Sequence, residues 1–163
     1  MRIISKTKVC FIIIIMAFCI SFTCCDNNTP PDVDSVQEHF LNNYSDIQVI
    51  VEYMVSSPYE NVYIMDANGT MQADLTWMEI DDEEVMAAVN NLLKNGEYIQ
   101  IIKIGNTISL LQWCGTRDIE CGIAYSINRT DAPDVQFMTT VVPITEDGWY
   151  YYIADYNKWR NTR

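Results

Sequence analysis

Short runs of β-forming residues, separated by turn residues, fill most of the chain beyond residue 60 and restrict what it can fold into. Asn68-Gly69 lies between two such runs and is typical of a hairpin turn, and Gly105-Asn106 joins two more. The predicted strands cover residues 61–65, 70–78, 98–104, 107–114, 120–128, 134–142 and 149–153. Because strands joined by short turns pair with their neighbours in sequence, we expect an antiparallel meander of about five to seven strands.

Three further segments have apolar residues at helical spacing: 34–44, 45–57 and 80–96. Two of them begin with the spacing of a capping box, formed by Ser35 with Glu38 and by Ser45 with Gln48. In the third, Asp81 is the predicted N-cap. Together the patterns predict an α+β fold with the helices packed on one face of the sheet.

The first 25 residues have a different character. After three basic residues, the run from Val9 to Phe22 contains 14 residues without a charge. A basic start followed by an apolar run of this length is typical of a secretory signal. Extended to Cys25, the uncharged run has 17 residues, whereas a membrane-spanning helix needs about 20. A processed signal is therefore favoured over an uncleaved anchor.

The end of this run resembles the signal of bacterial lipoproteins, in which a cysteine after the apolar region is acylated and becomes the first mature residue. Cys25 is the favoured acceptor, with Cys24 as the alternative, because Phe22 puts an apolar residue three positions before Cys25 and smaller residues follow. The family pattern has Leu where Phe22 stands, and Gly or Ala where Cys24 stands. The resemblance covers only this segment and implies a protein held by acyl chains on the outer face of the cytoplasmic membrane. An ordinary cleaved signal is the other interpretation.

Beyond residue 25, the chain divides into a short linker rich in Pro and Asn, residues 26–32, and one α+β domain, residues 33–163. All 22 acidic residues but only 7 of the 10 basic ones lie in this part, which gives it a formal charge of −15. Such a surface does not attract phosphate backbones, so we exclude nucleic-acid binding. Anionic lipid headgroups also repel it, so the membrane is a partner only through the lipid anchor.

Cys114 and Cys121 are the only cysteines beyond the signal segment. They flank a predicted turn and, outside the cytoplasm, form either a disulfide across the hairpin or two buried free thiols. Their spacing fits no zinc signature, and His39 is the only histidine. The chain has no glycine-rich phosphate loop and no hydrolase motif, so we expect no cofactor, no metal and no catalytic residues.

The segment 149–160 is rich in aromatic residues and holds the candidate binding residues, Trp149, Tyr150, Tyr152 and Trp159. Alternation along a strand puts Trp149 on the face opposite to Tyr150 and Tyr152. Exposed Trp and Tyr side chains are typical of surfaces that stack on sugar rings or hold peptides. The more frequent alternative is that these aromatic side chains pack in the core.

These observations favour a non-catalytic binding or interaction module whose ligand is an envelope protein or a glycan. One alternative is an enzyme that acts on envelope saccharide or peptide through Asp147 and Asp155. Another is a structural or inhibitory protein that caps a partner.

Overall fold

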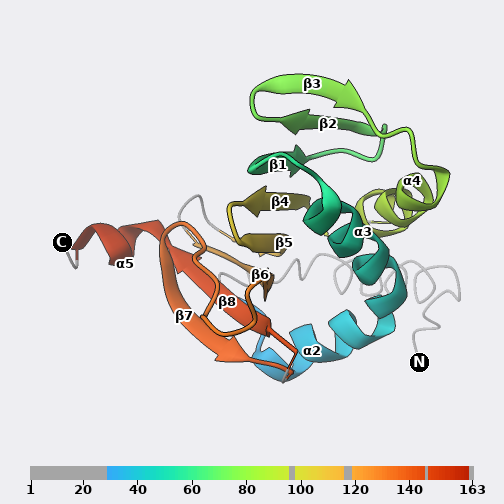
Figure 1. Cartoon of the computed structure of the whole chain (residues 1–163). Helices are drawn as coiled ribbons and strands as arrows, with labels where there is room; N and C mark the ends of the chain where they lie inside the picture. The colour runs from blue at the N-terminus through green and yellow to red at the C-terminus, as the bar shows by residue number, and fades with distance from the viewer. Residues whose placement is uncertain (1–28, 96–97, 116–118, 146, 162–163) are drawn as a thin grey trace, which may run out of the picture.

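The fold is organised around one antiparallel sheet in a computed structural model that describes residues 29–95, 98–115, 119–145 and 147–161 (Figure 1). Its strands are β1 (Asn61–Ile64), β2 (Thr70–Ala73), β3 (Thr76–Glu79), β4 (Gln100–Ile104), β5 (Thr107–Cys114), β6 (Ile119–Ser126), β7 (Met138–Pro143) and β8 (Trp149–Asp155). The helices are α2 (Val33–Asn42), α3 (Tyr44–Ser56), α4 (Glu83–Val89), the π-helical turn η1 (Asn90–Lys94) and α5 (Tyr156–Asn161). The α+β class is confirmed.

Among the described residues the sheet has eight strands in the order β3-β2-β1-β4-β5-β6-β8-β7, so the expected count of five to seven is wrong. The predicted strand 70–78 is in fact two strands, because Asp74 and Leu75 take positive φ angles of 43° and 72° and reverse the chain. Ala73 pairs with Thr76 across this two-residue turn. A turn with both central residues at positive φ matches the twist of a hairpin.

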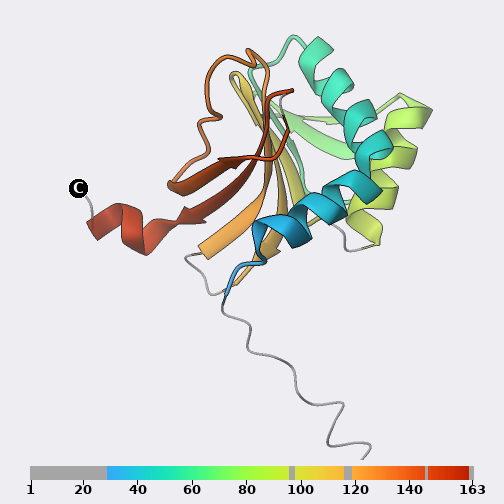
Figure 2. The same cartoon turned by 90° about the horizontal axis from the view of Figure 1, so that it is seen from below.

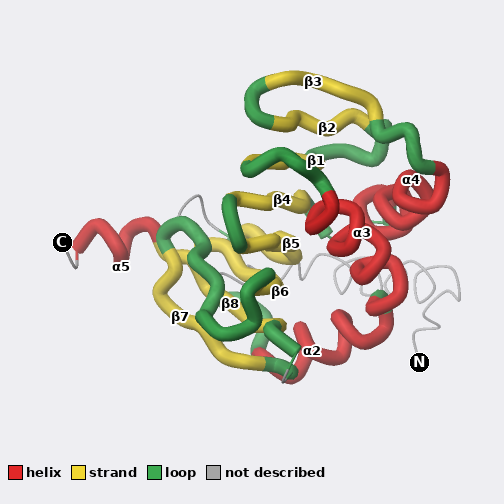
Figure 3. Tube along the Cα trace, in the orientation of Figure 1, coloured by secondary structure: helices red, strands yellow, loops and turns green. Residues whose placement is uncertain are grey.

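A simple meander describes only part of the order. β8 lies between β6 and β7, so β6 and β7 are neighbours in sequence but not in the sheet. The long loop between them, residues 127–137 and green in Figure 3, carries the chain to the edge of the sheet before β8 returns beside β6. The two predicted hairpin turns are confirmed, with Gly69 at φ 82° and Gly105 at φ 54°.

Helices α2, α3 and α4 cover one face of the sheet (Figure 2). The short helix α5 follows the C-terminal end of β8 and projects away from the sheet. The apolar stripes of α2, α3 and α4 meet the strands in one buried cluster that runs from Val36 in α2 to Tyr151 in β8. The predicted stripe of α4 and η1 is confirmed, since Val85, Val89 and Leu92 are all buried. Apolar burial on one side of each strand is what holds the helices on this face.

The helices begin one to three residues away from the predicted caps. The Asp32 carboxylate caps α2 by accepting a 2.8 Å hydrogen bond from the Ser35 backbone N–H. α3 begins at Tyr44 without a side-chain cap. At α4 the N-cap is Asp82, not Asp81, and its carboxylate accepts from two backbone N–H groups in the first turn. Asp and Ser are both good caps, so local sequence does not decide between adjacent ones.

Lys103 joins the sheet to the end of α3. Its Nζ donates hydrogen bonds of 2.7 Å to the Met54 carbonyl and 3.1 Å to the Ser57 carbonyl. The side chain is only 6% exposed, and burial lowers the pKa of the ammonium group. The last carbonyl groups of a helix have no backbone N–H partner within the helix, and the Lys103 ammonium group donates hydrogen bonds to two carbonyls at this end.

Within the described part of the chain, no helix is long and apolar enough to cross a membrane. The predicted signal, including Cys24 and Cys25, lies outside the described residues.

Candidate ligand-binding site

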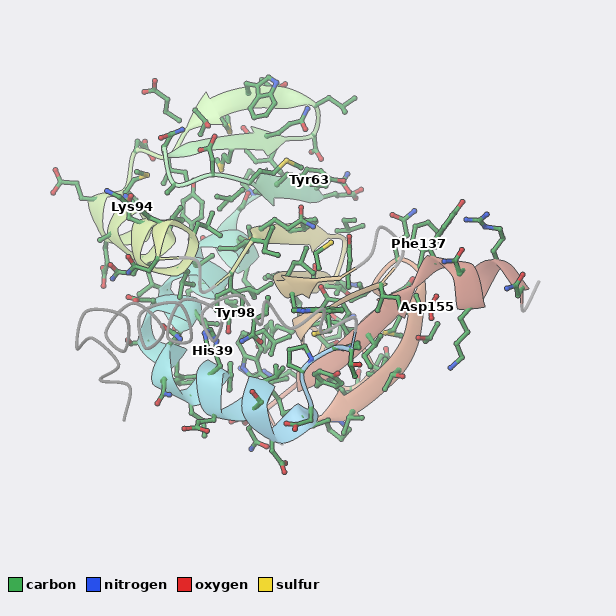
Figure 4. The ribbon with its side chains drawn as sticks, turned by 180° about the vertical axis from the view of Figure 1, so that it is seen from behind. His39, Tyr63, Lys94, Tyr98, Phe137 and Asp155 are labelled. Atoms are coloured by element: carbon green, nitrogen blue, oxygen red, sulfur yellow. The ribbon has the colours of Figure 1, made fainter. Side chains whose placement is uncertain are left out.

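The face of the sheet that the three large helices leave uncovered carries a pocket of about 640 Å³. Tyr63 on β1 and Phe137 in the loop before β7 both border it (Figure 4). Strands β4, β5, β6 and β8, the loop residues 134–136 and Tyr156 at the start of α5 supply the rest of the lining. The pocket therefore draws on segments more than ninety residues apart in sequence.

The strand register explains how these residues come to share one face. Tyr63 lies opposite Ile102, Ile102 opposite Ser109, and Ser109 opposite Ala124, which in turn lies opposite Tyr150. Residues directly opposite one another in a sheet project from the same side. The row crosses the sheet on the side away from the helices.

Small residues on β6 leave space above the sheet on this face. Gly122 lies opposite Tyr152, and Ala124 and Ala154 pack around the same tyrosine ring. A Cβ atom at Gly122 would collide with the carbonyl oxygen of Leu110, because a bulge in β5 brings its backbone close. A bulge next to a glycine is a common way to bend a sheet near a site.

Tyr152 lies in this hollow with only 2% of its surface exposed. Burial, and next the nearby Glu120 carboxylate, raise the pKa of its phenol well above the ordinary value. Within the described part of the chain, the hydroxyl makes no hydrogen bond. A neutral phenol donor without a protein partner thus lies close to an acceptor, the carboxylate of Glu120.

The remaining polar lining residues are neutral or acidic. Gln100, Thr107, Ser109 and Gln136 offer amide and hydroxyl groups, and Asp134 adds a second carboxylate. No Lys or Arg is among the described residues that line the pocket. A lining of this kind disfavours anionic ligands, since nothing there compensates a negative charge.

The four aromatic candidates divide between the two sides of the sheet. Trp149 is 4% exposed and packs in the main core, with its ring centroid 4.8 Å from that of Phe40. Tyr150 is half-buried on the opposite face, and Tyr152 lines the pocket. The side chain of Trp159 lies outside the described residues. Strand alternation in 149–153 is confirmed.

Asp147 and Asp155 do not form a pair. Asp155 is the last residue of β8 and Asp147 lies two residues before its first, so a strand of about 20 Å, at ~3.3 Å per residue, separates them. The Asp155 carboxylate accepts a 2.8 Å hydrogen bond from the Lys158 backbone N–H at the start of α5. Asp147 is exposed and borders a second hollow of about 420 Å³ on the helix side.

Cys114 and Cys121 are both free thiols in the structure. Trp113 pairs with Cys121, so Cys114, one residue further along the strand, points to the other face of the sheet. Cys121 is buried, and burial raises the pKa of its thiol to about 12. Such a thiol stays protonated and unreactive at neutral pH.

His39 belongs to the helix side of the molecule, where its Nδ1 lies 3.4 Å from the Tyr98 hydroxyl (Figure 4). Among the described residues, no group of three or more His, Cys, Asp or Glu side chains could hold a metal ion.

The sequence alone did not identify the residues that line the pocket together with Tyr152. Tyr63, Gln100, Ser109 and Glu120 come from four different strands, and only the pairing of those strands brings them together. One local signal was present, namely the small residues at 122 and 124 within a β-rich run, which are typical of a bulge or a close approach.

Compared with models of protein families, with curated proteins and with solved structures, the chain shows no match. The case for a function therefore depends on the geometry of this pocket.

Proposed function

We propose that this protein is a non-catalytic binding module and that the pocket on the open face of the sheet holds its ligand. The observation that carries the proposal is the hollowed, aromatic-lined face containing a tyrosine hydroxyl without a protein partner. The outer face of an antiparallel sheet is commonly solvated and polar. A concave site with apolar walls and a few convergent polar groups is the usual form of a ligand site.

The polar groups indicate what such a ligand carries. The Tyr152 hydroxyl can donate a hydrogen bond, and the Glu120 carboxylate beside it can accept one. Tyr63 and Phe137 add ring surface on which a flat apolar part of the ligand can rest. An uncharged or cationic compound with hydroxyl or amide groups fits this lining.

Binding is a better interpretation than catalysis for the groups that are present. Because the Tyr152 phenol is held in its neutral form, it acts as a donor and not as a base at neutral pH. The carboxylates Asp147 and Asp155, on which an enzymatic reading depended, lie at opposite ends of β8.

The proposal includes the location of the protein. We place the domain outside the cytoplasmic membrane, held by acyl chains at Cys25, or at Cys24 as the alternative. The basic start, the apolar run of 14 residues and the cysteine pair support this. Metabolic labelling with a fatty acid should be lost in Cys25→Ala. If labelling is lost only in Cys24→Ala, the acceptor is Cys24. If the wild type itself is not labelled, the lipid anchor is refuted.

The site is tested by ligand-observed NMR on the full chain in detergent, with a library of neutral saccharides, short peptides and small aromatic amides. In Ser109→Trp a large ring would fill the pocket from β5, whereas Val55→Trp puts the same ring beside the second hollow. We expect compounds that bind the wild type to be lost in Ser109→Trp and kept in Val55→Trp. Equal binding to both variants, or loss only in Val55→Trp, would refute the pocket as the site.

A further inference from the structure

We infer that the pocket is one end of an elongated site for a linear, uncharged oligosaccharide, and that Trp77 on β3 is the platform at its other end. This inference depends on the proposed function, because it names the ligand class for the same open face.

Trp77 lies in the row of residues that reaches the pocket. It pairs with Gln72 on β2, which pairs with Tyr63 on β1, and Tyr63 lines the pocket. Side chains at directly paired positions project from the same face of a sheet. Met78, its neighbour in sequence, faces the other way and packs against the core. Trp77 therefore shares a face with the pocket and not with the helices.

The Trp77 side chain is unusually exposed for so large a ring, at 66%. It lies on the outermost strand of the sheet, at the top of Figure 1. From Trp77 to Ser109 the row crosses four strand spacings, roughly 19 Å at about 4.8 Å each. That distance corresponds to a short oligosaccharide and exceeds the length of a monosaccharide.

The groups along the row follow a pattern that suits sugars. Aromatic and aliphatic side chains, Trp77, Tyr63 and Ile102, are interspersed with the amide of Gln72 and the hydroxyl of Ser109. A sugar ring has an apolar face that stacks on an aromatic ring and an edge of hydroxyls that both donate and accept hydrogen bonds. The donor of Tyr152 beside the acceptor of Glu120 matches two neighbouring hydroxyls of one sugar.

A peptide is served less well by this face. β1, β2, β4 and β5 each have a hydrogen-bonded neighbour on both sides, so their backbone groups are already used in the sheet. An extended peptide needs partners for its own N–H and C=O groups, which edge strands provide and sheet faces do not. The excess of carboxylates on the face also disfavours acidic polysaccharides, so the chain of sugars is uncharged.

The test uses the fluorescently labelled full chain in detergent on an array of neutral oligosaccharides: β-1,4-glucans, β-1,4-linked N-acetylglucosamine chains, α-1,4-glucans and mannans. Each is presented as a disaccharide and as a hexasaccharide. We expect at least one hexasaccharide to bind about tenfold more tightly than its disaccharide. In Trp77→Ala, binding of that hexasaccharide should fall about fivefold to tenfold while binding of the disaccharide is unchanged. Trp77→Phe keeps a ring at this position and should retain most of the affinity.

Tyr44→Ala is the matched control, because Tyr44 is an exposed aromatic residue on the helix side. Added salt reports on the charge of the ligand. A neutral oligosaccharide keeps its affinity as the salt concentration rises, whereas a cationic ligand loses much of its affinity. Equal loss in Tyr44→Ala and Trp77→Ala, or no loss in Trp77→Ala, overturns the role of Trp77. If no glycan binds while the NMR library yields a pocket ligand, the oligosaccharide is wrong and the binding module stands. If both experiments are negative, both proposals fail.

Discussion

The hydroxyl of Tyr151 donates a 2.8 Å hydrogen bond to the carbonyl of Pro31, which precedes it by 120 residues. The bond ties the segment before α2 to the strand β8, on the face where the helices pack. Tyr151 is 3% exposed, so the phenol is shielded from water around this contact.

The Tyr151 contact predicts a measurable loss of stability in Tyr151→Phe. Removing the hydroxyl leaves the ring packed but the Pro31 carbonyl without its partner. We expect the free energy of unfolding in urea at pH 7 to fall by about 1 kcal/mol. Tyr44→Phe is the control, because Tyr44 is exposed at the start of α3 and its ring is kept in the variant. An equal loss in both variants would argue against the contact.

The same residue predicts a loss of stability at alkaline pH. Burial, and to a lesser extent Cys121 and Asp32, raise the pKa of Tyr151 from 10 to about 12. Because the folded protein holds this proton more tightly than the unfolded chain, the stabilisation is complete below pH 10 and is lost as the pH rises from 10 through 12. Unfolding in urea, measured from pH 8 to 12, should show a fall that is smaller in Tyr151→Phe. A fall of unchanged size would contradict the assignment.

Lys103→Met should destabilise the fold without altering the open face. The substitution removes the donor shared by the Met54 and Ser57 carbonyls and leaves the end of α3 without a cap. We expect a loss of about 1–3 kcal/mol in the free energy of unfolding. Lys94→Met, at an exposed position, should change it by less than about 0.5 kcal/mol. Chemical denaturation measures the loss in free energy of unfolding for both variants. Equal losses would show that Lys103 does not cap α3.

Gly122→Ala should be poorly tolerated because there is no room for a methyl group. Its Cβ atom would meet the Leu110 carbonyl at the bulge, and backbone cannot move aside as a side chain can. The expected loss is about 2–3 kcal/mol in the free energy of unfolding. At Gly105 the surrounding space is open, and Asn tolerates the positive φ, so Gly105→Asn should cost less than about 1 kcal/mol. Similar midpoints for the two variants would mean that the close approach at Gly122 is relieved at little cost.

Leu75→Gly should stabilise the protein. Leu75 is 87% exposed and holds a φ of 72°, so its side chain contributes little burial while its backbone conformation is strained. Relief of this strain should raise the free energy of unfolding by about 0.5–1 kcal/mol. Leu75→Ala removes the same exposed surface but keeps the strain, and should give no gain. Thermal unfolding of both variants separates the loss of exposed apolar surface from the relief of backbone strain. A gain in stability in Leu75→Ala but not in Leu75→Gly would contradict the strain.

Local sequence was sufficient for those parts of the fold that depend on near neighbours. The positive φ at Gly69 and Gly105 follows from what glycine permits, and the stripe of Val85, Val89 and Leu92 follows from helical spacing. Strand alternation likewise separated Trp149 from Tyr152. Each of these features depends on interactions within a few residues.

The features that were missed depend on segments far apart in the chain. A turn at Asp74-Leu75 lacks the glycine that usually marks it, and it persists because β2 and β3 pair on either side. The insertion of β8 between β6 and β7 is also a pairing between strands that are not adjacent in sequence, and local sequence does not specify it.

The chain by itself determined the α+β class, the helical stripes and the alternation of the aromatic strand, because these follow from spacing along a few residues. Only the tertiary structure decided that Trp149 packs in the core while Tyr152 lines a pocket on the open face together with Tyr63 and Glu120. The physical reason is that a binding face is made by the register between strands, and pairing between distant strands is decided by burial of the whole core.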